Sequence, residues 1–268
     1  MESLVLSAKY LDNLSGQPSH YHDCHQLLFI SEGEADVIVG KSKFSASRGS
    51  LILTNRFENH SLTIRSSTYR RYYIRITPML PHYGDERDRL LSILTDRNEN
   101  FTNVIDVSRH FERFNDFFSA IAEEYSCSQK MKSLRSDILL FDLLILLYRE
   151  YPDLFTEDGD KKIDVIRDME LRFREDYNQE YSLSSLSEDY HLNRYYLSHL
   201  FKKVTGYSVM EYLSRCRLTA AKRYLTATDL PIGDIVEKCG FRDNSDFSRL
   251  FKSQNGMSPS EFRKTFSK

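Results

Sequence analysis

One sequence pattern occurs twice in the last third of the chain, between residues 181 and 264. An offset of 49 residues aligns 183–192 with 232–241, and after one inserted residue an offset of 50 aligns 197–212 with 247–262. Many aligned positions carry identical or chemically similar residues. Matches at such a nearly constant spacing indicate an internal duplication, so this region must fold as two similar units.

The first copy predicts two short helices joined by a tight turn. Ser182 can cap a helix that runs to about Tyr190, residues 191–193 make the turn, and a second helix spans Arg194 to Val204. Apolar residues of the second helix form a stripe that turns inward. Its outward side chains are Tyr195, Ser198, His199 and Lys202.

The second copy repeats this arrangement. It predicts helices at Ile232–Lys238 and Asp243–Ser253, with a turn at 239–241. The outward side chains of its second helix are Asn244, Ser245, Ser248 and Arg249. Two short helices, the second apolar inside and polar outside, are typical of a helix-turn-helix.

The 19 residues between the copies, 209–227, contain no helix breaker and predict one connecting helix. Such a helix spans about 28 Å at 1.5 Å per residue. This is close to the roughly 34 Å that separates successive major-groove entries on one face of B-DNA. DNA binding is therefore favoured, and the alternative is a protein-binding helical scaffold whose exposed cations are merely solvated.

Three motifs in this region are specific: Gly240-Phe241, FSRLFK at 247–252 and GMSP at 256–259. With their surroundings they closely resemble the AraC/XylS family of bacterial transcription regulators, which bind DNA through two helix-turn-helix units joined by a helix. The resemblance implies DNA contacts from Tyr195, Ser198 and His199 in the first unit, and from Asn244, Ser245, Asp246 and Arg249 in the second. Both copies also place cations late in the exposed helix, and Lys202 and Lys252 are expected to contact DNA as well.

Two of these residues have an evident base partner, because Arg249 can bind guanine bidentately and Asn244 suits adenine. Asp246 departs from expectation, since a carboxylate would face the phosphates. It can accept from cytosine N4 or pair internally with Arg242 or Arg249, and the residues favour neither. His191 is a second departure, at a turn position where Gly or a small residue is usual.

Residues 26–76 predict six short strands with close turns and no intervening helix, which favours an antiparallel barrel or sandwich. The strands are Gln26–Ile30, Ala35–Val39, Lys43–Ala46, Ser50–Thr54, Ser61–Ile64 and Tyr69–Ile76. Members of the resembled family with an amino-terminal half of this length are similar to cupins. The resemblance implies a barrel that binds a small-molecule effector, often a sugar.

Helical periodicity follows, with one helix from Ser108 to Tyr125, capped by Ser108, and another from Ser133 to Tyr151. The second is apolar nearly all round and must be covered on two sides. These helices are the expected contacts of a homodimer, although packing within one chain explains them nearly as well.

We predict an α+β chain. Residues 1–155 form a cupin-like antiparallel β-barrel with following helices, for effector binding and dimerisation. Residues 156–162 are a polar linker. Residues 163–268 form an all-α DNA-binding domain with two helix-turn-helix units, beginning with a helix from about Ile163 to Arg174.

Histidines and arginines mark a candidate ligand pocket in the barrel. His20 and His22 are two residues apart, hence on one face of a strand, and His60 could complete a metal site. Gln26 stands where metal cupins often have Glu and is a poor ligand, so a polar pocket without metal is favoured. The predicted ligand-binding residues are His22, His60, Arg71 and Tyr73, with Arg75 either beside them or turned to solvent.

The net charge of −2 is unevenly distributed: residues 181–268 carry 14 Lys and Arg against 9 Asp and Glu, a balance of +5, which leaves −7 for residues 1–180. The basic part is therefore expected to meet an anion.

Four cysteines without Cys-x-x-Cys spacing and a start without signal character predict a reduced, cytoplasmic protein. No apolar run reaches the roughly 20 residues of a membrane span.

An effector-responsive, DNA-binding regulator is the leading hypothesis. The alternative is a cupin-type metal-dependent enzyme with an appended helical domain. No Ser/His/Asp or Cys/His constellation, phosphate loop or clean three-ligand metal set supports it. Enzymatic activity and a cofactor are therefore not expected.

Overall fold

The computed structural model describes residues 3–78, 80–81, 83–96, 100–155 and 161–266. The chain forms two compact units, unit 1 (Met1–Gly159) and unit 2 (Asp160–Lys268). Most of the predicted linker lies outside the described residues, which resume at Lys161.

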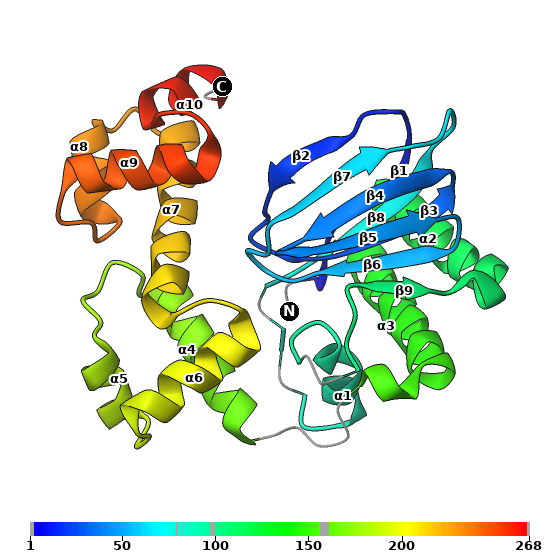
Figure 1. Ribbon diagram of the computed structural model, residues 1–268, viewed down its shortest axis with the longest axis horizontal. Helices are drawn as coiled ribbons and strands as arrows, with labels where there is room; N and C mark the ends of the chain where they lie inside the picture. The colour runs from blue at the N-terminus through cyan, green and yellow to red at the C-terminus, as the bar shows by residue number, and fades with distance from the viewer. Residues whose placement is uncertain (1–2, 79, 82, 97–99, 156–160, 267–268) are drawn as a thin grey trace. The chain divides into compact units, whose positions relative to one another are not determined.

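Two antiparallel β-sheets make up the body of unit 1 (Figure 1). The strand order is β1-β8-β3-β6-β9 in one sheet and β2-β7-β4-β5 in the other. The strands are β1 (Val5–Asp12), β2 (Gln17–His20), β3 (His25–Glu32), β4 (Glu34–Val39), β5 (Ser42–Ser47), β6 (Ser50–Thr54), β7 (His60–Ile64), β8 (Arg70–Ile76) and β9 (Val104–Asp106). The predicted α+β class with an amino-terminal antiparallel β domain is confirmed.

All six predicted strands are present, with ends within two residues of the prediction. The sequence did not reveal β1, β2 and β9, and each of these lies at the edge of its sheet. An edge strand is less enclosed and its apolar pattern is weaker, as in β1, where only Val5 and Ala8 are buried. Central strands such as β6 are buried throughout and are easily predicted.

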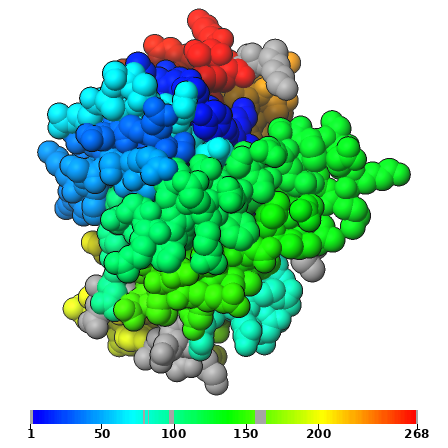
Figure 2. All heavy atoms as spheres, turned by 90° about the vertical axis from the view of Figure 1, so that its right-hand side faces the viewer, coloured from blue at the N-terminus to red at the C-terminus, as the bar shows by residue number. Residues whose placement is uncertain are grey.

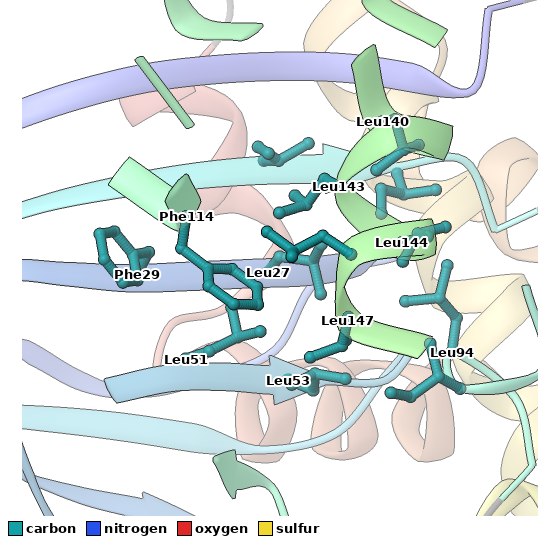
Figure 3. Close-up of a cluster of buried hydrophobic side chains, with 14 of the residues drawn as sticks. Leu27, Phe29, Leu51, Leu53, Leu94, Phe114, Leu140, Leu143, Leu144 and Leu147 are labelled. Atoms are coloured by element: carbon teal, nitrogen blue, oxygen red, sulfur yellow. The ribbon is translucent and has the colours of Figure 1, made fainter. Parts of the chain in front are cut away.

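Buried side chains form two core layers because neighbouring residues of β3 point to opposite faces. Leu28 and Ile30 pack between the two sheets with residues of the four-stranded sheet such as Leu62. Leu27 and Phe29 point the other way, into a larger cluster that includes side chains from two covering helices (Figure 3).

These covering helices are α2 (Phe111–Ser126) and α3 (Lys132–Glu150), shown in green on one face of unit 1 in Figure 2. The predicted cap was wrong. Ser108 begins a short 3-10 turn, η1 (Ser108–His110), where its N–H donates to the Asp106 carboxylate at 2.9 Å, and α2 starts only at Phe111.

One face of α3 is covered within unit 1, by contacts of residues such as Leu144 and Leu147. On other faces Leu134 and Ile138 remain 52% and 49% exposed. The smaller elements of unit 1 are α1 (Glu86–Ser92) and η2 (Pro152–Leu154). The apolar surface of α3 is thus only partly covered by this unit.

Unit 2 consists of helices α4 (Lys161–Glu175), α5 (Leu183–Asp189), α6 (Arg194–Thr205), α7 (Val209–Ala227), α8 (Ile232–Lys238), α9 (Asn244–Asn255) and α10 (Pro259–Phe266). The predicted bounds of α7 and α8 are confirmed to the residue, whereas α10 was not predicted. Among the described residues, no helix has both the length and the apolar character needed to cross a bilayer.

Candidate DNA interface and ligand site

The outer helices of the two copies, α6 and α9, have the same length and the same pattern of exposure. Each has 12 residues, and buried, partly buried and exposed positions occur in the same order along both. Leu197 and Phe201 are buried in α6 where Phe247 and Phe251 are buried in α9. Both copies therefore turn the same set of positions outward.

Both helices also begin and end in the same way. Asn193 caps α6 by accepting from the N–H of Tyr195 at 2.8 Å, and Asp243 caps α9 by accepting from the N–H of Asp246 at 2.7 Å. Gly206 and Gly256 end them in left-handed conformation, with φ of 79° and 74°. Glycine adopts this conformation without strain, so each helix stops at its twelfth residue.

A capping box follows each of these glycines. The Ser208 N–H and hydroxyl bind the carboxylate of Glu211, and Ser258 binds Glu261 likewise. These hydrogen bonds lower the pKa of both glutamates. The boxes start α7 in the first copy and α10 in the second, which identifies α10 as the counterpart of the first turns of α7.

The tight turns differ in one respect. His191 has a φ of 52° and Gly240, at the equivalent position, a φ of 75°. A Cβ on Gly240 would lie 2.8 Å from the Cα of Asn178, so the second turn has no room for a side chain. The exposed His191 can adopt the same backbone at a modest cost in strain.

The structure gathers the predicted DNA-contact residues on the outward faces of α6 and α9. Tyr195 is 81% exposed and stacks on His199, with ring centroids 6.4 Å apart. Ser198 is partly buried beside them. The exposed residues of the predicted set are Tyr195, His199, Lys202, Asn244, Ser245, Asp246, Arg249 and Lys252.

Asp246 and Arg249 form an ion pair one turn apart on α9. Their side chains are 68% and 78% exposed, so water screens the pair and separating it costs little. Arg242 instead contacts Glu180 at 2.5 Å. Asp246 thus holds the guanidinium of Arg249 on the outward face of α9.

Arg194 was not predicted as a contact, although it is exposed at the first position of α6. The offset of 50 residues aligns it with Asn244, so comparison of the two copies makes it a further candidate contact. A guanidinium at the start of α6 is suited to a base edge or a phosphate.

A cleft of about 350 Å³ lies in unit 2, along α7 and α9. It is lined by Tyr207, Met210, Glu211, Ser214, Arg215, Leu218, Leu250 and Gln254. This cleft is distinct from the predicted ligand residues, which all belong to unit 1.

In unit 1, Arg71, Tyr73 and Arg75 share one face of β8, as the alternation predicts. Arg71 and Tyr73 pair directly with Ile30 and Leu28 of β3, which face the space between the sheets. Directly paired residues point to the same side, so the β8 side chains also line this space. Arg71 is only 2% exposed.

The guanidinium of Arg71 is incompletely satisfied. One Nη2–H donates to the carbonyl of Ser15 at 3.3 Å, while Nε and Nη1 have no hydrogen-bond acceptor among the described residues. Burial lowers the pKa of this guanidinium and raises that of the neighbouring Tyr69, whose hydroxyl also has no partner there. Buried polar atoms of this kind normally bind a partner, so the interior is suited to a polar ligand.

Three histidines meet at one end of β8. One ring nitrogen from each of His20, His22 and His60 can be chosen so that all lie within 4.8 Å of one another. Arg75 contacts the Nε2 of His22 at 3.2 Å. The strand assumed for His20 and His22 was wrong for His22, because β2 ends at His20 and His22 lies in the irregular segment that follows. His60 is buried, and burial lowers its pKa to about 4.

Two family models match the chain: an AraC-like ligand binding domain over residues 3–144, more than half of the chain, and a helix-turn-helix domain over residues 186–265. The uncharacterized HTH-type transcriptional regulator YisR of Bacillus subtilis is 25% identical over 260 residues, which cover 90% of this chain and 86% of YisR. The HTH-type transcriptional activator RhaS of Escherichia fergusonii is 23% identical over 259 residues, covering 92% and 87%.

Among solved structures, ToxT from Vibrio cholerae aligns with a TM-score of 0.64 over 98% of this chain and 100% of its own, at 16% identity. This similarity shows a shared fold. The two family matches account for both halves of the molecule, the sheets with their interior polar groups and the duplicated helical units. The chain therefore belongs to the AraC family of transcription regulators, with an amino-terminal ligand-binding domain and a carboxy-terminal DNA-binding domain.

Proposed function

We propose that this regulator reads DNA with the outer faces of α6 and α9 and that a small molecule held between the sheets of unit 1 controls this binding. The observation that carries the proposal is the identical pattern of exposure on α6 and α9, which presents two comparable polar faces. Each face offers side chains that can reach the edges of bases in a major groove.

The two faces read DNA with different chemistry. In α9, Arg249 binds guanine bidentately after leaving Asp246, and Asn244 binds adenine. In α6, Tyr195, Ser198 and His199 make smaller polar and apolar contacts. Lys202 and Lys252 occupy equivalent positions on the two helices and bind phosphates, which positions the protein without selecting sequence. Ser245 and Asp246 complete the α9 face.

The effector is a sugar or another small polar metabolite, bound by Arg71, Tyr73, His22 and His60. The unsatisfied N–H groups of the buried Arg71 support this assignment, because hydroxyl or carboxylate oxygens would accept from them. A thermal-shift screen of such metabolites on the full chain tests it. A compound that stabilises the native chain but not Arg71→Met is the expected result.

We further propose that the protein is a homodimer. Exposed apolar side chains of α3, Leu134 and Ile138, are the supporting observation, since a second copy would cover them. Sedimentation of the native chain and of Leu134→Lys distinguishes a dimer from a monomer. The predicted boundaries, with residues 1–155 as the effector domain and 163–268 as the DNA-binding domain, are part of the same proposal.

The relatives named above are regulators, and we propose that this chain likewise acts by binding and not as an enzyme. We also propose that it acts in the bacterial cytoplasm, where its DNA target would lie. The direct test is binding of the full chain to sequences selected from random duplex DNA, measured by fluorescence anisotropy. Asn244→Ala combined with Arg249→Ala should remove the preference at the base pairs that α9 reads, and Lys238→Ala, on α8, should retain it. A preference that is unchanged at every base pair after the double substitution would contradict the proposal.

A further inference from the structure

The three histidines of unit 1 come from segments that pairing between β2 and β7 brings together. His20 ends β2 and lies directly opposite His60, the first residue of β7. His22 follows two residues after His20, and its ring centroid is 4.7 Å from that of His20 and 5.2 Å from that of His60. Three imidazoles thus share one small volume beside the interior of the sheets.

Backbone carbonyls determine which nitrogen of two rings carries the proton. The Nδ1 of His20 lies 2.7 Å from the carbonyl oxygen of Pro18, and the Nδ1 of His60 lies 2.9 Å from that of Glu58. A carbonyl only accepts, so both Nδ1 atoms must donate. In the neutral rings both Nε2 atoms therefore present a lone pair.

The third ring points to the same result. The Nη2 of Arg75 lies 3.2 Å from the Nε2 of His22, and a guanidinium can only donate, so this Nε2 accepts. It also lies 3.2 Å from the Nε2 of His20. Two lone pairs at this distance repel unless a proton or a metal ion lies between them. The Nε2 of His60, a residue 6% exposed, has no hydrogen-bond partner among the described residues.

We propose that His20, His22 and His60 bind one divalent late transition-metal ion, of the class of Zn²⁺, Ni²⁺ or Co²⁺, through their Nε2 atoms. Imidazole nitrogen suits this class of ion. Tetrahedral coordination with metal–nitrogen distances of about 2.05 Å places ligand nitrogens about 3.3 Å apart. The separation of 3.2 Å between His20 and His22 already matches this geometry.

The surrounding contacts hold the ligands in place before a metal binds. The N–H of Phe57 donates to the carbonyl of His22 at 2.7 Å, and the neighbouring Asp23 forms a largely buried ion pair with Arg56 at 2.5 Å. The carbonyls on the Nδ1 atoms of His20 and His60 orient these rings as outer-shell partners do in metal sites. A fourth coordination position is left for water or a ligand oxygen.

Arg75 is the group that opposes the metal. Its guanidinium must release the lone pair of His22, and the side-chain oxygen of Gln26, 3.4 Å from its Nε, offers an alternative partner. Removing the guanidinium therefore favours the ion. A histidine cluster that binds no metal would not gain metal affinity when the Arg75 guanidinium is removed.

Metal binding can be measured without DNA or effector, and the titrations omit both because His22 and His60 are also proposed to bind the effector. The native chain is freed of metal with a chelator and titrated with Co²⁺, followed by visible absorption, and with Zn²⁺, followed by calorimetry. We expect one ion per chain and Co²⁺ bands typical of nitrogen and oxygen ligands. His60→Ala and His20→Ala should each weaken binding at least about 100-fold, since loss of a mere outer-shell partner costs 10–100-fold.

His110→Ala is the matched control, because His110 lies elsewhere in unit 1, paired with Glu150 at 3.1 Å, and should bind as the native chain does. Arg75→Met should bind more tightly than the native chain. His20 lies at the sheet edge, so His20→Ala decides the question if His60→Ala fails to fold. Binding of equal strength in the native chain and in His20→Ala, or no stoichiometric binding at all, would overturn the proposal.

Discussion

The two helix-turn-helix copies have matching buried positions and helix ends but carry different side chains on their outward faces. Their inward positions and helix ends match: Phe201 and Phe251 are both buried, and Gly206 and Gly256 both end their helices. Their outward positions have diverged, so that His199 stands where the other copy has Arg249. Packing and capping thus constrain one set of positions, while the other set is available for sequence recognition.

The largest expected effect is on the free energy of unfolding, and it should differ between the two tight turns. Gly240→Ala should lower the free energy of unfolding by about 2–4 kcal/mol, because the Cβ would meet the backbone of Asn178 in a left-handed conformation. The matched change in the other copy, His191→Gly, should alter it by less than about 1 kcal/mol. Urea unfolding of the full chain measures both. Equal changes in the free energy of unfolding at the two positions would show that the contact with Asn178 does not contribute to stability.

The next largest effect is on specific DNA binding, and it should differ between the outward faces of α9 and α6. Arg249→Ala should cost about 1–3 kcal/mol of specific DNA binding and relax the preference at one base pair, because a bidentate contact is lost. His199→Ala, at the equivalent position of α6, should cost less. Binding isotherms on the selected sequence and on its single-base variants provide the measurement. If both variants lost the same affinity on every sequence, neither residue would be a base reader.

A smaller effect on stability is expected at the capping boxes, which both copies share. Ser208→Ala and Ser258→Ala each remove a helix cap, and the first should cost about 1 kcal/mol in urea unfolding. The native hydrogen bonds depress the pKa of Glu211, so this part of the stability is complete above the pKa of an unfolded glutamate, about 4.3, and is lost as the pH falls through the lower folded value. Glu211→Gln should therefore show a flatter decline of stability in acid than the native chain does.

The smallest effect concerns the phosphate contacts. Lys202→Ala and Lys252→Ala should weaken binding to all sequences alike and should each reduce the slope of log affinity against log salt by about one. Titrations at several salt concentrations on specific and random duplexes measure this. A change of sequence preference in either variant would assign that lysine to a base.

Local sequence predicted the bounds of two helices to the residue but did not predict the strand that ends at His20, for a physical reason. The bounds of α7 and α8 follow from caps, periodicity and breakers that lie within a few residues of each helix end. The histidine cluster depends on the pairing of β2 with β7, which joins residues 40 positions apart across an unpredicted edge strand. His20 and His22 were accordingly placed on one strand, whereas β2 ends at His20 and His22 lies in the irregular segment that follows it.

The ion pairs of the α9 face likewise could not be predicted from the sequence alone. The sequence left open whether Asp246 pairs with Arg242 or with Arg249, because both lie within reach along the chain. In the structure Arg249 is its partner, and Arg242 contacts Glu180, 62 residues away. Residue types therefore identified the polar face, and the fold determined which charges on it meet.

The central claim is that α6 and α9 read separate segments of one DNA site by different means. Binding sequences selected from random duplex DNA with the native chain, with His199→Ala and with Arg249→Ala test it most directly. The account predicts that each variant relaxes a different position of the recovered motif, about one helical turn, roughly 10 base pairs, apart. Relaxation of the same positions by both variants, or a motif unchanged in both, would contradict it.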